Sequence, residues 1–163
     1  MRIVGIDPGL DGAIALIQTD PMMLRVEDMP TFTVRSGKTD KRRVDAGALA
    51  HALEEWHRPA AIDRVYIEKV GAMPGQGVTS MFGFGFSAGM IEGIVAALKI
   101  PYEYMTPQAW QALAKVAGGK DGSRQKASRL FPCDADMFIR KKDNGRSDAV
   151  CIAYAGARDL RLL

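Results

Sequence analysis

RIVGID at residues 2–7, PGLDG at residues 8–12 and AIALIQ at residues 13–18 form the stretch that decides the fold. The two outer segments are short aliphatic and β-branched runs, and the segment between them is rich in Gly and Pro. This arrangement is typical of a β-hairpin. A single acid, Asp7, ends the first run. The stretch therefore predicts two antiparallel strands, with a carboxylate where the first strand meets its turn.

Further strands and helices follow this hairpin. We expect a third strand at residues 24–29, continuing through residues 31–34, and then a basic loop, RSGKTDKRR, at residues 35–43. Later strands are expected at residues 65–70 and 102–106, and helices at residues 44–56, 79–98, 107–116, 123–131 and 147–160. This order predicts an α/β fold with a mixed five-stranded sheet, antiparallel in its first three strands and flanked by helices. Residues 1–163 are expected to form a single domain, because no linker or repeat divides them.

The charge pattern permits a nucleic-acid partner. The formal net charge is only +3, but basic residues gather in residues 35–43 and again in residues 115–146. Such clusters suit contacts with phosphates. Solvated surface loops have the same composition, so charge alone leaves both interpretations open.

Other features concern compartment and membrane. The two cysteines are too far apart in sequence for a zinc signature, and we interpret both as reduced packing thiols. The first residues lack an apolar secretory segment, which favours the cytoplasm of a bacterium or a phage-infected host. Residues 70–91 carry no charge, but seven of them are Gly or Pro, so no membrane span is expected.

Three acids stand at the ends of apolar elements. Asp7 and Glu68 each end a predicted strand, and Asp148 opens the predicted last helix behind a candidate N-cap, Ser147. A buried carboxylate without a partner costs several kcal/mol. Each acid also has an ordinary role available, in a turn, on a strand edge or in a first helical turn. If the strands of Asp7 and Glu68 are neighbours, all three acids meet at one sheet edge, and their hard oxygens suit Mg²⁺, with Mn²⁺ as a substitute.

Three segments are similar to a known family. IDPGLDGAIAL (residues 6–16), IEKVGAMPGQGVTSMFGFGFSAGMIEGIVAAL (67–98) and KKDNGRSDAVCIAYAG (141–156) resemble the acidic motifs of RuvC-type Holliday junction resolvases, particularly the small phage-encoded members. The resemblance implies an RNase H-like fold, a homodimer and paired metal-dependent incisions in four-way and other branched DNA. It makes Asp7, Glu68 and Asp148 the metal-binding catalytic acids. The family often has another acid or His where Gly145 stands here, so Asp143 is the nearest candidate for a fourth catalytic carboxylate.

The resemblance also suggests how DNA is bound and cut. In a two-metal mechanism one ion activates a water and the other stabilises the leaving oxygen, with Asp7 between them. Phosphate contacts are expected from basic residues of the second cluster, namely Lys115, Lys120, Arg124, Lys126, Lys141, Lys142 and Arg146. The family's aromatic wedge is replaced by Gly71, and Met73 or Phe82 are alternatives that also suit the core.

The predicted helix at residues 79–98 contains Gly85, Gly89 and Gly93, spaced by four. Glycines weaken a helix unless close packing compensates. We therefore expect this helix either in the homodimer interface or packed closely on the sheet.

Three alternatives remain open at this point. GIDPGLDGAIAL, residues 5–16, also resembles the first phosphate loop of sugar kinases and actin-like ATPases, although such proteins need a second lobe. A junction-binding protein that has lost catalysis would show a replaced carboxylate, and none of the three is replaced. A nuclease of RNA:DNA hybrids or of less selective branched-DNA specificity would use the same metal site.

Overall fold

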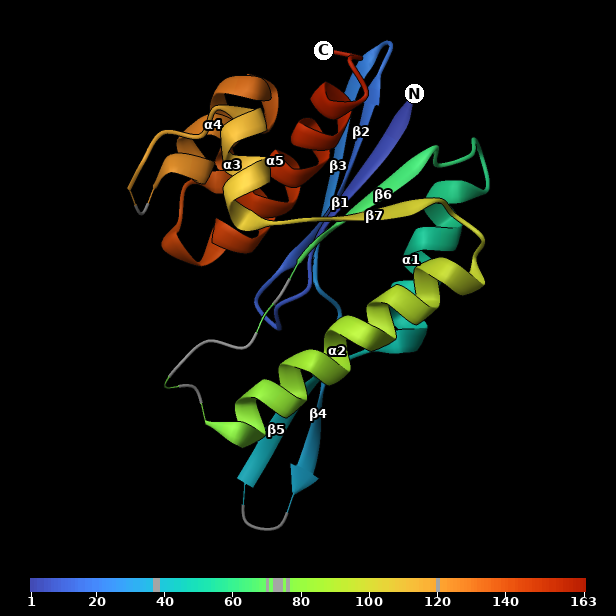
Figure 1. Cartoon of the computed structure of the whole chain (residues 1–163), viewed down its shortest axis with the longest axis vertical. Coiled ribbons are helices and arrows are strands. Elements are labelled where there is room, and N and C mark those ends of the chain that lie inside the picture. Colours follow the sequence, from blue (N-terminus) through green and yellow to red (C-terminus); the bar gives the residue numbers. More distant parts are fainter. Residues whose placement is uncertain (37–38, 70, 72–74, 76, 120) are drawn as a thin grey trace.

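The computed structural model describes residues 1–36, 39–69, 71, 75, 77–119 and 121–163, and its centre is a mixed five-stranded sheet (Figure 1). The strand order is β3-β2-β1-β6-β7. β1 (Arg2–Asp7), β2 (Ala13–Thr19) and β3 (Met22–Asp28) pair with one another antiparallel, whereas β6 (Arg64–Glu68) and β7 (Tyr102–Met105) run parallel to β1. The predicted mixed sheet with three antiparallel leading strands is confirmed.

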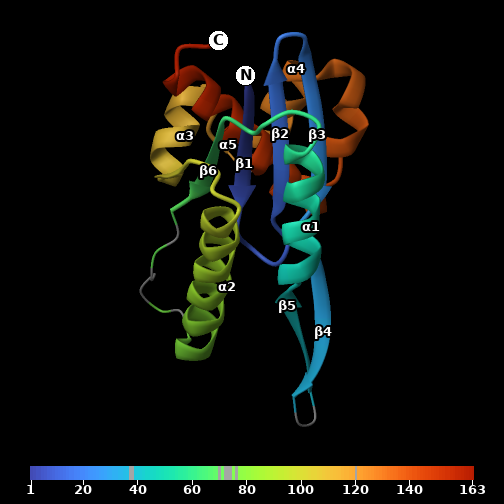
Figure 2. The same ribbon diagram turned by 90° about the vertical axis from the view of Figure 1, so that its right-hand side faces the viewer.

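Helices cover both faces of this sheet (Figures 1 and 2). α1 (Ala46–His57) and α2 (Val78–Ala97) lie on one face, and α3 (Pro107–Ala114), α4 (Gly122–Leu130) and α5 (Asn144–Asp159) lie on the other. Two 3₁₀ segments, η1 (Pro132–Phe138) and η2 (Lys141–Asp143), join α4 to α5.

Strand alternation divides the core between the two faces. On β1, Val4 and Ile6 pack with α1 and α2, while Ile3 packs with α5. α1 contributes Leu49, Leu53 and Trp56, all fully buried, to the first of these clusters. Each such side chain contributes roughly 1.5–3 kcal/mol of burial free energy. The helical stripe expected from the spacing of these three residues is therefore the stripe that faces the sheet.

α5 lies unusually close to the sheet. A Cβ atom on Gly5 of β1 would lie 2.3 Å from the carbonyl oxygen of Ala149, and one on Gly156 would lie 2.2 Å from the ring of Tyr66 in β6. Neither glycine can carry a side chain without moving the helix. These contacts set the height of α5 above β1 and β6.

Residues 35–43 are not the loop that the sequence predicted. Thr31–Ser36 forms β4 and Thr39–Val44 forms β5, and the two pair as a separate antiparallel hairpin. Pro30 explains the break from β3, because proline lacks the N–H that a continuing strand would need. This β4–β5 hairpin projects beyond the main sheet (Figure 1).

The last helix begins earlier than predicted. Asn144 and Gly145 form its first turn rather than a separate turn, and the buried Ser147 is inside the helix instead of capping it. Its hydroxyl donates to the carbonyl of Asp143 at 3.0 Å. Gly145 packs on the β1–β2 loop, where a Cβ atom would lie 2.1 Å from the carbonyl oxygen of Asp11.

The glycine stripe of α2 has no close neighbour within the described part of this chain, although Ile91 and Val95 of the same helix are buried in the core. Among the described residues, no atom outside α2 lies within 4 Å of a Cβ atom placed on Gly85, Gly89 or Gly93. Phe82 on the same helix is 75% exposed, so it does not belong to the core. The expectation that these glycines pack closely on the sheet is therefore wrong, and the expectation of a dimer interface stays a prediction.

Replacing Gly5 tests how much the fold depends on the approach of α5. We expect Gly5→Ala to lower the free energy of unfolding by about 3 kcal/mol or more, because the methyl group meets helix backbone that cannot rotate away. Gly47→Ala is the control, since its methyl group would make only an ordinary contact, 3.5 Å from Asp45. That variant should be neutral or gain up to about 1 kcal/mol. Urea denaturation of both variants measures the difference, and equal stabilities would contradict this role of Gly5.

Candidate active site

Asp7 and Glu68 lie side by side at the ends of two neighbouring parallel strands. Ile6 of β1 is in register with Ile67 of β6, so the next residue on each strand is an acid at the same level. Each acid lies two residues after a residue that faces α5, Gly5 for Asp7 and Tyr66 for Glu68, so both acids are on the α5 face of the sheet. Adjacent strands are about 4.8 Å apart. The two carboxylates therefore share one face and one end of the sheet.

Asp148 reaches the same place from α5. The neighbouring residue, Ala149, lies over Gly5 of β1, two residues before Asp7. The charge of Asp148 contributes to the raised pKa of Asp7, and the charge of Glu68 contributes to the raised pKa of both Asp7 and Asp148, so the three acids lie close together. The structure thus brings together the three acids that the sequence singled out.

Burial and mutual repulsion make two of these acids hard to ionise. Burial is the main cause that raises the pKa of Asp7 to about 7; the charges of Glu68, Asp148 and Asp11 also raise it, and a hydrogen bond from Gly9 opposes the shift. Burial also raises the pKa of Asp148 to about 6, again with a contribution from Glu68, while Ser123 opposes the shift. The low dielectric around these carboxylates strengthens their repulsion.

Two hydrogen bonds orient the acids. The backbone N–H of Gly9 donates to Oδ1 of Asp7 at 3.1 Å. Asp7 therefore also stabilises the turn that follows it, which was the alternative, non-catalytic role predicted for this acid. Nε1 of Trp110 in α3 donates to Oε1 of Glu68 at 2.9 Å. The sequence did not indicate Trp110, because it lies 42 residues from Glu68 and only the packing of α3 brings them together. The one available signal was a Trp early in a helix that begins with Pro107.

The chemistry of these donors fits a divalent cation. None of the three carboxylates forms an ion pair with any residue that the structure describes. A metal ion would supply the missing positive charge, and the all-oxygen set suits Mg²⁺. The acids are neighbours rather than a finished ligand cage: within the described ranges, no three Asp, Glu, His or Cys side chains are close enough to hold one ion. Side-chain rotation would have to bring them together.

Asp143 lies outside this group. Its buried carboxylate receives hydrogen bonds from the backbone N–H, Nε and Nη2 of Arg140 at 2.8, 3.2 and 3.0 Å. The Arg140 guanidinium holds the pKa of Asp143 below its usual range. Within the described part of the chain, every hydrogen bond to this carboxylate comes from Arg140, so its arrangement is that of a structural ion pair at the start of α5. The position expected for a fourth ligand, Gly145, cannot carry one because it packs on the β1–β2 loop.

The predicted phosphate-binding residues divide into two groups. Lys115, Lys141 and Lys142 are exposed. Arg124 instead bonds the carbonyl of Ile139 and the carboxylate of Asp121, and Lys126 lies 5.0 Å from the ring centre of Tyr154. Arg146 is held by Asp28 at 2.5 and 2.6 Å. Lys120, like the wedge candidate Met73, lies outside the described residues.

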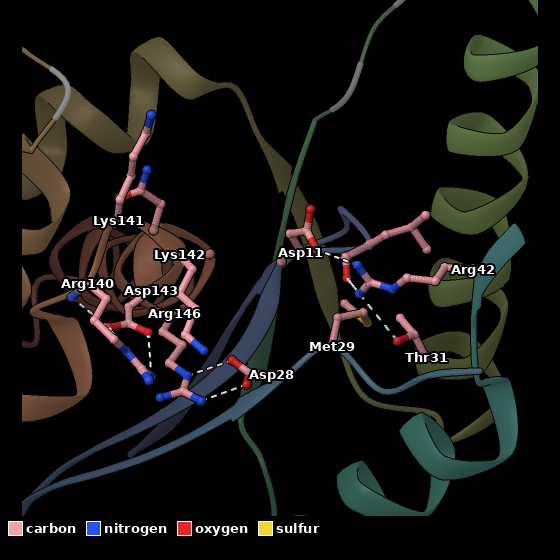
Figure 3. A pocket seen from close by; sticks show the side chains of 14 residues that line it. Asp11, Asp28, Met29, Thr31, Arg42, Arg140, Lys141, Lys142, Asp143 and Arg146 are labelled. Carbon is pink, nitrogen blue, oxygen red and sulfur yellow. Dashed lines mark hydrogen bonds and ion pairs between the residues drawn. The ribbon is translucent and has the colours of Figure 1, made fainter. Parts of the chain in front are cut away.

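A pocket of about 840 Å³ lies beside the β1–β2 loop (Figure 3). Its walls come from this loop, the base of the β4–β5 hairpin and residues 140–146. Three ion pairs neutralise charges in these walls: Asp11 with Arg42, Asp28 with Arg146, and Asp143 with Arg140. Lys141 and Lys142 add two further positive charges. The pocket therefore favours an anion, and it adjoins the loop that follows Asp7, although none of the three acids lines it.

Arg42 is a further residue of interest that the sequence left unassigned. Its guanidinium donates to Oδ1 of Asp11 and to the carbonyl of Leu10, both at 2.6 Å. Leu10 and Asp11 belong to the loop that follows Asp7. Arg42 thus joins the hairpin to the loop beside the acids. In the sequence, nothing distinguishes Arg42 from the other basic residues of its run, because its partners lie 31 and 32 residues away.

Comparison with known proteins bears on the fold. Neither a protein-family model nor a curated protein sequence matches the chain. Among solved structures, Thermus thermophilus RuvC in complex with a Holliday junction substrate is 13% identical, with a TM-score of 0.67 over 99% of this chain and 96% of that chain. A second T. thermophilus RuvC structure is 18% identical, with a TM-score of 0.59 over the same shares.

A eukaryotic structure is also similar. The yeast mitochondrial Holliday junction resolvase Ydc2 is 14% identical, with a TM-score of 0.56 over 96% of this chain and 78% of that chain. The chain therefore has the RNase H-like fold of RuvC and other Holliday junction resolvases.

Proposed function

We propose that this protein is a metal-dependent DNA endonuclease that cuts four-way junctions and related branched DNA. The observation that carries the proposal is the convergence of Asp7, Glu68 and Asp148 at one end of the sheet, without a cationic partner in the described part of the chain. The fold supports it, since the similar structures are named as Holliday junction resolvases. A fold by itself does not establish activity, so the site carries the argument.

Each acid has a distinct place in the proposed site. Asp7 is central, because both other carboxylates raise its pKa, and it is the residue that would contact both ions. Glu68, oriented by Trp110, and Asp148 would each hold one side. Bound Mg²⁺ or Mn²⁺ would lower the pKa of an attacking water and stabilise the charge that develops on the leaving oxygen.

DNA would approach from the side of the pocket. Lys141 and Lys142 are exposed in its wall and are free to contact phosphates, whereas Arg124 and Arg146 are engaged in protein contacts. We therefore assign phosphate positioning to these lysines, with Lys115 as a peripheral contact. The two arginines instead hold the protein framework.

The exposed face of α2 is proposed as a homodimer interface. Val78, Phe82 and Phe86 are 79%, 75% and 55% exposed and are spaced by four, so they form one apolar stripe. α2 is long and apolar enough to cross a membrane by length and composition alone. A second copy is the better occupant, because a two-fold dimer would present two active sites to the two strands of a four-way junction.

Removing the charge of each acid should separate cutting from binding. We expect Asp7→Asn, Glu68→Gln and Asp148→Asn to reduce cleavage of a labelled four-way junction in Mg²⁺ by at least about 10³-fold, because ion binding and water activation fail together. Junction affinity in Ca²⁺ should stay within a few-fold of the original. Asp143→Asn is the control: once folded, it should still cut. Cleavage of duplex DNA and of an RNA:DNA hybrid is measured in the same assay to establish the substrate class. Faster cutting of the hybrid than of the junction would overturn the assignment as a junction endonuclease.

The raised pKa of Asp7 predicts a pH-dependent stability. Because the carboxyl binds its proton more tightly in the folded state, its contribution to stability is greatest at low pH and declines as pH rises from about 4 to about 7. Asp7→Asn should therefore raise Tm in EDTA, and the gain should grow over this range and level off above pH 7. Mg²⁺ should shrink the gain at pH 8 by stabilising the original protein. An exposed variant, Asp136→Asn, controls for the lost charge, and a pH-independent Tm difference for Asp7→Asn would contradict the electrostatics.

The dimer proposal can be tested at Phe82. Phe82→Glu should shift the protein from dimer to monomer in sedimentation velocity at micromolar concentration, because each copy would place a charge in the apolar interface. Leu10→Glu, which is also at an exposed position but outside α2, should stay dimeric. A monomeric unmodified protein would refute the interface, and sedimentation of the protein with phospholipid vesicles would instead assign α2 to a membrane.

A further inference from the structure

The β4–β5 hairpin has two chemically different faces. In an antiparallel pair, residues in register lie on the same side, and Phe32 is in register with Arg43 just as Val34 is with Lys41. These four side chains therefore share one face, here called the outer face. Thr33 and Arg42, also in register, share the opposite, inner face.

The inner face is attached to the protein body. Val44, two residues after Arg42 and so on the same face, is 2% exposed and belongs to the core with α1 and α2. Arg42 bonds Leu10 and Asp11 of the β1–β2 loop. These contacts hold the base of the hairpin against the loop beside the proposed metal site. They also fix the direction in which the outer face points.

The outer face combines positive charge with an aromatic side chain. Lys41 and Arg43 are exposed, and Phe32 is 46% exposed. The described acid of the hairpin, Asp40, alternates with Lys41 and so lies on the inner side. Among the described residues, neither Lys41 nor Arg43 forms an ion pair. In the described part of the hairpin, the outer face thus carries two positive charges and an exposed ring without an acid, whereas the inner face carries Arg35 and Arg42 together with Asp40.

This combination fits the backbone of DNA. Lysine and arginine neutralise phosphates, and an aromatic ring packs on sugars or on an unpaired base. The hairpin projects beyond the end of the sheet at which β1 ends (Figure 1), and Thr31 and Arg42 at its base line the pocket (Figure 3). A DNA segment that leaves the metal site on that side would meet the outer face.

We infer that the β4–β5 hairpin is a DNA-binding arm, whose outer face of Phe32, Lys41 and Arg43 holds the phosphate backbone of a duplex arm adjoining the cut. The inference rests on the proposed function. It adds a contact outside the acids and the lysines of the pocket, and Arg42 positions this contact relative to the metal site.

The test compares two double variants that remove equal charge. Lys41→Ala with Arg43→Ala changes the outer face, and Arg58→Ala with Arg158→Ala is the control at the opposite end of the sheet, after α1 and in the last turn of α5. Junction affinity is measured by fluorescence anisotropy in Ca²⁺ over a series of salt concentrations. The outer-face variant should bind at least about tenfold more weakly at 0.1 M salt, and its log K against log salt slope should fall by about two. The control should change neither quantity appreciably.

The outcomes separate the arm from the proposed function. Unmodified protein that binds and cuts junctions, with an outer-face variant of unchanged affinity and slope, overturns the arm alone. Unmodified protein that neither binds nor cuts junctions overturns the proposed function and, with it, the arm. Sedimentation velocity of the outer-face variant completes the test: affinity lost together with dissociation into monomers would make this face an interface between copies. A weaker-binding variant that keeps its oligomeric state and Tm supports the arm.

Discussion

The close approach of α5 to β1 and β6 is the constraint on which the candidate site depends. Glycine at positions 5 and 156 allows helix backbone and strand backbone, or helix and ring, to touch directly. Gly145 does the same between the first turn of α5 and the β1–β2 loop. Because the helix is held this closely along its length, Asp148 is brought to the strand ends at which Asp7 and Glu68 stand. Bulkier residues would lift the helix and separate the third acid from the other two.

This packing concentrates negative charge in a half-buried place. Burial and like-charge repulsion raise the pKa of Asp7 and Asp148, so ionising these two acids costs more free energy in the folded protein than in the unfolded chain. Such an arrangement lowers stability, and sites that bind ions or perform chemistry are where proteins retain it. In the same region, Asp143 and Asp28 are matched with arginines and act as framework. The contrast between paired and unpaired acids is what distinguishes the proposed site from its surroundings.

The β4–β5 hairpin adds a second layer to this arrangement. Arg42 uses its charge internally, on Asp11 and Leu10, while the adjacent Arg43 points to the opposite side of the hairpin. Two neighbouring arginines in one basic run therefore have unlike surroundings. The same division occurs in residues 140–146, where Arg140 and Arg146 are paired within the protein and Lys141 and Lys142 remain exposed. Basic residues near the site thus serve either its framework or its exposed surface.

Local patterns in the sequence determined the main sheet, its helices and the three acids, but not the β4–β5 hairpin: β-branched runs flanking PGLDG specify a hairpin, and an acid that ends an apolar strand is conspicuous wherever the strand lies. The tertiary structure alone decided which charges are neutralised. Trp110 meets Glu68 across 42 residues, and Arg42 meets Asp11 across 31. The true start of α5 likewise depended on packing, because Asn144 and Gly145 are turn formers until Gly145 lies on the β1–β2 loop. Hydrogen bonds and ion pairs between distant residues depend on separations in space, which no local spacing of residue types encodes.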